Sequence, residues 1–120
     1  MEKIYQKETI EKFYANEIDG SCYVFNVIRF NPLSCDLSAI FEEGYAGVYI
    51  LARDAQCDKK GLEPLCCGGS DDFKSEFSDA EKFKPVLDAG ANAICYVYEP
   101  LDELRKFIID DVISEFGLKE

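Results

Sequence analysis

Apolar positions in the first third of the chain follow two different periods. Over residues 7–18 they recur at helical spacing, at Ile10, Phe13, Tyr14 and Ile18. This spacing predicts an amphipathic helix that ends before Gly20. Residues 21–30 are rich in β-branched and aromatic side chains, which predicts a strand that is covered on both faces. Ser34 is the expected N-cap of a short helix that follows.

The rest of the chain alternates between strand-like and helix-like patterns. We expect strands at about 45–53, around Leu65 and at 93–99. A helix is expected directly after Ser70, and a capping-box pattern predicts a second helix start at Ser78. Pro85 is expected to kink or restart that helix. The last predicted helix begins at Pro100, ends near Gly117 and carries one apolar stripe, at Leu104, Phe107, Ile108 and Val112.

This order of elements predicts a small α/β protein of the α+β type. We expect a central, mainly antiparallel sheet flanked by helices, in one compact domain. Residues 1–44 are expected to form a helix–strand extension that packs on a core of residues 45–120.

The charge of the chain restricts the partners that it can bind. Its 120 residues include 24 Asp and Glu against 13 Lys and Arg, a net charge of −11 spread along the sequence. Such a surface repels nucleic-acid phosphates and attracts basic grooves on other proteins, although solubility alone would also explain the charge. No apolar run is long enough to span a membrane and the N-terminus lacks a signal peptide, so we expect a cytoplasmic protein without a membrane partner.

The cysteines do not form the spacing of a metal site. Six are present without any C-x-x-C pair, and the chain contains no histidine. We therefore expect reduced thiols, no metal and no cofactor. A cysteine nucleophile is not expected either, because no histidine could act as its base.

Two neighbouring strand segments carry a resemblance to a known family. Gly47–Leu51 and Leu65–Ser70 lie ahead of a helix, and in this order they resemble the two name motifs of the GIY-YIG nucleases. The resemblance covers about residues 45–116 and implies that the two segments are adjacent antiparallel strands. Tyr49 matches the tyrosine of the first motif and Gly68 the glycine of the second, whereas Cys66 replaces a tyrosine.

The resemblance also implies where a nuclease would carry its catalytic groups. Glu76 stands at the position of the arginine that binds the scissile phosphate, and Ala80 stands where a histidine or tyrosine is expected. Ile109 stands at the position of the metal-binding glutamate, with Asp110 and Asp111 beside it. A glutamate in place of the arginine sets negative charge against the phosphate, so we expect a pseudoenzyme without catalytic residues.

The expected function is the binding of another protein through an acidic surface. The candidate residues are Asp71, Asp72, Glu76, Asp79, Asp102, Glu103, Asp110 and Asp111. The expected partner is a protein with a basic nucleic-acid-binding groove, as for phage-encoded inhibitors of CRISPR or restriction systems, with no direct binding of nucleic acid. One alternative is a metal-dependent endonuclease that uses Asp110 or Asp111 as a relocated ligand. The other is a structural module, with a homodimer possible.

Overall fold

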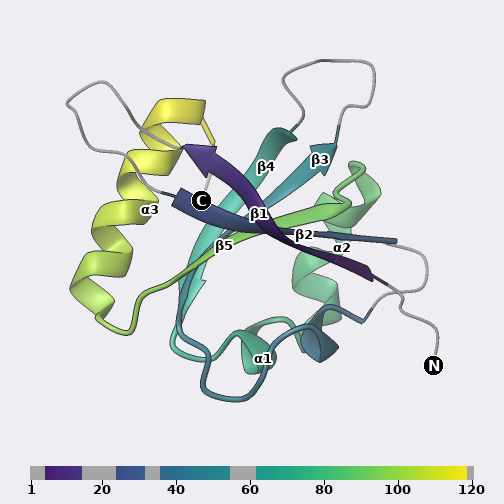
Figure 1. Cartoon of the computed structure of the whole chain (residues 1–120), viewed down its shortest axis with the longest axis horizontal. Helices are drawn as coiled ribbons and strands as arrows, with labels where there is room; N and C mark the ends of the chain where they lie inside the picture. Colours follow the sequence, from purple (N-terminus) through teal and green to yellow (C-terminus); the bar gives the residue numbers. More distant parts are fainter. Residues whose placement is uncertain (1–4, 15–23, 32–35, 55–61, 119–120) are drawn as a thin grey trace.

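The computed structural model describes residues 5–14, 24–31, 36–54 and 62–118. In these ranges a five-stranded antiparallel sheet is flanked by three α-helices, which confirms the predicted α+β class (Figure 1). The strand order is β1-β2-β5-β3-β4. The strands are β1 (Tyr5–Tyr14), β2 (Val24–Phe30), β3 (Gly47–Asp54), β4 (Leu62–Ser70) and β5 (Ala93–Tyr98). The helices are the 3-10 helix η1 (Leu37–Ala39), α1 (Phe73–Glu76), α2 (Ala80–Asp88) and α3 (Asp102–Phe116).

A separate hydrophobic core lies on each face of the sheet. Successive residues of β3 point to opposite faces, so Tyr49 and Leu51 belong to one core and Val48 and Ile50 to the other. Helices α1 and α2 pack on the first face and α3 packs on the second (Figure 1). The face of the sheet on which a side chain lies therefore decides which other side chains it can contact.

The helix predicted over residues 7–18 is wrong, because Tyr5–Tyr14 form the edge strand β1. This strand pairs antiparallel with β2, and its register shifts between Glu8 and Phe13. Pairing with β1 satisfies backbone N–H and C=O groups along the outer edge of β2 that would otherwise lack partners. Helical spacing is a local signal, which this non-local pairing overrides. The remainder of the predicted helix lies outside the described residues.

The two parts of the chain share one sheet. Strand β2, from the predicted extension 1–44, pairs with β5 of the predicted core. Phe25 and Val27 of β2 are fully buried in the core beneath α3. The predicted strand of this extension is thus present as β2, and a second strand, β1, stands in place of its predicted helix.

Several helix boundaries differ from the prediction by a few residues. Helix α2 begins after Asp79, whose side chain accepts a hydrogen bond from the Lys82 backbone N–H, so Asp79 rather than Ser78 is its N-cap. Pro85 lies inside this helix and does not restart it. The proline removes one hydrogen bond to a carbonyl of the exposed first turn, where water can replace it. The predicted cap Ser34 lies outside the described residues, and Asp36 caps η1.

The apolar stripe predicted for α3 divides into buried and exposed residues. Ile108 and Val112 are buried against the sheet, whereas Leu104 and Phe107 are largely exposed. The helix ends at Gly117, which adopts the left-handed conformation (φ +66°) expected after a helix C-terminus. Within the described part of the chain, no helix is both long and apolar enough to cross a bilayer.

Three strands meet at the end of the sheet from which α1 and α3 begin. Gly47, the first residue of β3, pairs with Ser70 at the end of β4 and with Tyr98 at the end of β5. The connections to α1 and to α3 therefore leave the sheet at the same end. The acidic residues that begin these two helices therefore follow the same end of the sheet, on opposite faces of it.

Candidate functional site

An open hollow of about 660 Å³ lies where β4 passes into α1 and α2. Its lining is formed by Gly44, Ser70, Asp71, Asp72, Ser75, Glu76, Asp79 and Lys82. Four carboxylates face a single ammonium group, so the hollow is negatively charged. The structure thus brings together on one concave surface the four acidic residues that the sequence assigned to this region.

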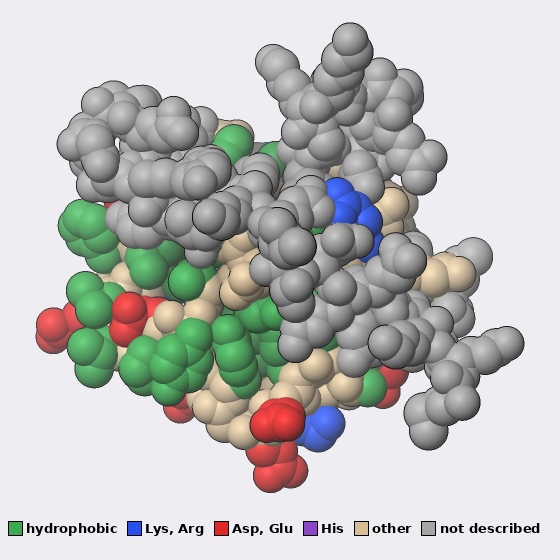
Figure 2. Space-filling view, viewed as in Figure 1, with side chains coloured by type: hydrophobic (Ala, Val, Ile, Leu, Met, Phe, Trp, Pro, Cys, Tyr) green, Lys and Arg blue, Asp and Glu red, His purple; other side chains and the backbone are tan. Residues whose placement is uncertain are grey.

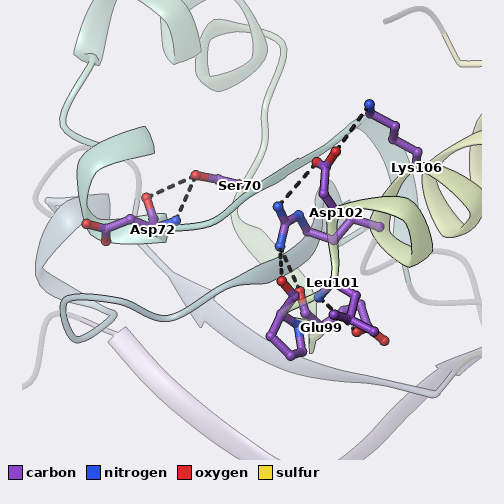
Figure 3. Close-up of polar contacts among 8 residues, drawn as sticks. Ser70, Asp72, Glu99, Leu101, Asp102 and Lys106 are labelled. Carbon is purple, nitrogen blue, oxygen red and sulfur yellow. Dashed lines mark hydrogen bonds and ion pairs between the residues drawn. The ribbon is translucent and has the colours of Figure 1, made fainter.

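Asp72 has a structural task within this hollow. Its carboxylate accepts hydrogen bonds from the backbone N–H groups of Lys74 (3.2 Å) and Ser75 (3.4 Å), which caps α1. The same oxygen accepts a hydrogen bond from the Gly44 N–H (3.2 Å), on the segment that leads to β3. Ser70 completes the turn, since its hydroxyl accepts from the Asp72 N–H (3.0 Å) and donates to the Asp72 carbonyl (3.1 Å), as Figure 3 shows. Asp72 therefore fixes the shape of the hollow as well as its charge.

Asp71 and Asp79 keep carboxylate oxygens that a partner can reach. Asp79 caps α2 through one oxygen, and Asp71 is exposed at the turn between β4 and α1. Capping uses one carboxylate oxygen and leaves the second available, because an ionised carboxylate has several acceptor positions. Asp71 and Asp79 therefore present negative charge to solvent along the hollow.

Glu76 is held from two sides. The Tyr49 hydroxyl donates a hydrogen bond of 2.7 Å to Glu76 Oε2, and the Lys82 Nζ lies 2.6 Å from the same oxygen. The Tyr49 ring is buried among Phe73, Phe77 and Phe83, with ring centroids 5.5, 4.9 and 6.0 Å away. Burial, followed by the hydrogen bond to Glu76, raises the pKa of Tyr49 far above its ordinary value. Tyr49 is thus a neutral donor that orients a carboxylate.

We expect Tyr49→Phe to lower the free energy of unfolding by about 1 kcal/mol, the usual net value of one hydrogen bond. A second effect concerns pH. Above the ordinary tyrosine pKa of 10.0, the unfolded chain releases a proton that folded Tyr49 retains, so the stability of the native protein falls as pH rises. Tyr49→Phe removes this contribution and is expected to lose less stability between about pH 8 and about pH 11.

Urea unfolding at the two pH values checks both expectations. The half-buried Tyr45 also has a pKa raised to about 12, chiefly by burial, so part of the alkaline loss persists in the variant. An equal alkaline loss in Tyr49→Phe and in the native protein would show that Tyr49 does not carry the predicted linkage.

The two family-like segments are adjacent antiparallel strands, and Tyr49 lies opposite Gly68. A Cβ atom at Gly68 would lie 2.5 Å from the Tyr49 hydroxyl oxygen, so only glycine leaves space for this tyrosine. Cys66, at the replaced tyrosine position, faces the same core, and burial raises the pKa of its thiol. The next residue, Cys67, faces the opposite core, where burial raises its thiol pKa to about 12.

The remaining positions of the resemblance do not meet at the hollow. Ala80 is the exposed first residue of α2 and does not line it. Ile109 packs with the α3 core, and its side chain lies against Gly69 on the face opposite Tyr49. The positions of the arginine and of the metal ligand are therefore separated by the sheet.

The acidic residues of α3 form a second group. Asp102 accepts a hydrogen bond from Lys106 (3.2 Å), which lowers its carboxyl pKa (Figure 3). Glu103 and Asp110 are exposed, and Asp111 is half-buried. Because α3 covers the other face of the sheet, Asp110 and Asp111 lie on the far side from Tyr49, whereas the first turn of α3 shares the sheet end that carries Asp71.

Two basic residues were missed by sequence reasoning. Lys82 lies across a helix break from Glu76, so the usual spacing of four residues within one helix could not reveal their pair. Lys74, on α1, does not pair with Glu76 and donates to the Ser38 carbonyl (3.1 Å). Arg105 is buried, with Nη1 donating to the carbonyls of Glu99 (3.1 Å) and Pro100 (3.0 Å). Arg105 precedes Ile108 by three residues and Val112 by seven, so its spacing places it on the buried face of α3, and this spacing is the signal that could have revealed its burial.

Over the described ranges, no three Asp, Glu or Cys side chains are grouped so that they could hold a metal ion. The paired caps and the Tyr49–Glu76–Lys82 contact indicate a rigid acidic surface.

No protein-family model, no curated protein and no solved structure matches this chain at a significant level, so its likeness to the GIY-YIG nucleases stays a prediction.

Proposed function

We propose that this protein is a catalytically inactive inhibitor that binds a protein with a basic nucleic-acid-binding groove, such as a CRISPR effector or a restriction enzyme. The observation that carries the proposal is the concave acidic lining of the hollow, in a chain of net charge −11. A groove that attracts phosphates also attracts a fixed array of carboxylates.

The arrangement of the carboxylates supports competition with nucleic acid. Asp72 and Asp79 are held by backbone N–H groups, and Glu76 is held by Tyr49 and Lys82. Acidic groups that are already ordered lose little conformational entropy when a partner binds them. The same groups repel a free phosphate backbone, so the protein itself is expected not to bind DNA or RNA.

The alternative, a metal-dependent GIY-YIG-type endonuclease, has less support. Its relocated ligand would be Asp110 or Asp111, across the sheet from Tyr49 and Glu76. This alternative predicts Mg²⁺- or Mn²⁺-dependent cleavage that disappears in Asp110→Ala or Asp111→Ala. Cleavage with that dependence would replace the proposed function.

The test of the proposal is binding to purified CRISPR effectors and restriction endonucleases, with and without the charges of the hollow. The triple variant Asp71→Asn, Asp72→Asn, Asp79→Asn removes three charges, and asparagine still caps helices well. We expect it to weaken binding by more than about tenfold at low salt. A control with Glu63→Gln, Glu81→Gln and Asp88→Asn changes the net charge equally away from the hollow and is expected to bind nearly as well as the native protein.

Two results would contradict the proposal. If none of these enzymes binds, while a gel-shift assay at low salt shows firm binding of the protein to DNA or RNA, the acidic surface does not act as proposed. Equal weakening by the two triple variants would show a general effect of charge that does not depend on the hollow.

A further inference from the structure

Four large apolar side chains are exposed at the end of the sheet where α3 begins. They are Tyr98 (58% exposed), Leu101 (58%), Leu104 (47%) and Phe107 (59%), and we call the last three, which belong to α3 and its N-cap, the α3 patch. Leu104 and Phe107 are three residues apart on α3, where side chains at this spacing are neighbours, and Leu101 is the N-cap of the same helix. Figure 2 shows hydrophobic side chains gathered over this end of α3 and its connection to β5, with acidic side chains at the margin.

The patch rests on a rigid support. Arg105 holds the connection between β5 and α3 through the Glu99 and Pro100 carbonyls and lies 3.3 Å from Asp102. The Leu101 N–H donates to the Glu99 carboxylate (3.1 Å, Figure 3). Exposed apolar groups on an ordered support are the usual anchors of a protein interface.

The charges around the patch select its occupant. Glu99, Asp102, Glu103 and Asp110 border it, against Arg105 and Lys106. Both of these cations pair with Asp102, so the border remains negative. A second copy of the chain would bring an equal negative border and another −11 charges against it, and an anionic lipid surface would be repelled in the same way.

We propose that the α3 patch docks a protein segment that presents apolar side chains flanked by Lys or Arg. This inference rests on the proposed function and deepens it, since it names the part of the surface that anchors the basic partner. The apolar side chains supply most of the affinity by losing contact with water, and the carboxylate border selects basic partners.

A defined peptide tests the inference. A short amphipathic helical peptide of leucine and lysine with one tryptophan reports its own binding by fluorescence, because the protein contains no tryptophan. We expect saturable binding to the full-length protein, weakened more than about tenfold by the double variant Leu104→Ser, Phe107→Ser. The matched control Glu81→Ser, Lys84→Ser on α2 also preserves net charge and is expected to bind like the native protein.

Other results would overturn the inference. These are no binding of the peptide, equal binding by the serine variant, equal binding of a leucine–glutamate peptide, or binding of anionic phosphatidylserine vesicles. A concentration-dependent dimer in sedimentation that Phe107→Ser abolishes would assign the patch to a second copy. Thermal melts of the serine variant confirm that it is folded.

The two proposals can fail separately. Peptide binding that requires Leu104 and Phe107, without binding to any nucleic-acid-binding enzyme, would keep the docking site and remove the proposed function. Binding to such an enzyme that survives Leu104→Ser, Phe107→Ser would keep the function and remove the docking site.

Discussion

Gly47→Ala is expected to lower the free energy of unfolding by more than about 3 kcal/mol, above the usual range for overpacking. A Cβ atom at this position would lie 2.0 Å from the backbone carbonyl oxygen of Val97 and 3.2 Å from the Glu99 nitrogen. Both neighbours are backbone atoms, so no side-chain rotation can relieve the contact. Strands β3 and β5 would have to separate, although they are paired at the middle of the sheet.

Chemical denaturation of Gly47→Ala measures this effect, and Gly117→Ala is its control. Gly117 adopts a left-handed conformation, and a Cβ atom there would have no neighbouring atom within 4 Å. Alanine at this position is therefore expected to cost only about 1–2 kcal/mol, the penalty of the backbone conformation itself. A loss below about 1 kcal/mol in Gly47→Ala would contradict the close approach of the two strands.

Phe73→Ala is expected to destabilise the protein by about 3–5 kcal/mol. Phe73 is fully buried at the start of α1. Its ring contacts four other aromatic rings, those of Phe41 (4.9 Å), Tyr45 (5.2 Å), Tyr49 (5.5 Å) and Phe77 (5.6 Å). Alanine would leave a cavity that these rigid rings cannot fill without moving.

Phe107→Ala is the matched control, because it is the same substitution at a ring that is 59% exposed. It is expected to change stability by less than about 0.5 kcal/mol. Thermal or urea unfolding of both variants gives the comparison. Equal losses would mean either that α1 is not packed as described or that the α3 patch is covered.

The sequence predicted the strands of the sheet well except for one of its two edge strands, β1. Strands β3, β4 and β5 have the periodicity and flanking residues of strands, and all three are found near their predicted positions. The edge strand β1 was predicted as a helix, since apolar spacing alone cannot show that β2 needs a partner. Pro85 was expected to interrupt a helix that continues through it.

The candidate site was predicted only in part, because some of its contacts depend on tertiary packing. Asp71, Asp72, Glu76 and Asp79 lie close together in sequence, and a local turn brings them to one hollow. The pair between Glu76 and Lys82 crosses a helix break, and the separation of Ile109 from Tyr49 depends on which face of the sheet α3 covers. Such relations follow from the tertiary packing of the helices, which no local pattern contains.

The central claim is that the acidic hollow competes with nucleic acid for a basic groove. Its most direct measurement is the displacement of fluorescent DNA, at low salt, from a CRISPR effector or restriction endonuclease that the full-length protein binds. We predict displacement at near-stoichiometric concentration, weakened more than about tenfold in the triple variant Asp71→Asn, Asp72→Asn, Asp79→Asn. Undiminished displacement by that variant, or DNA that stays bound at every concentration of the native protein, would contradict the claim.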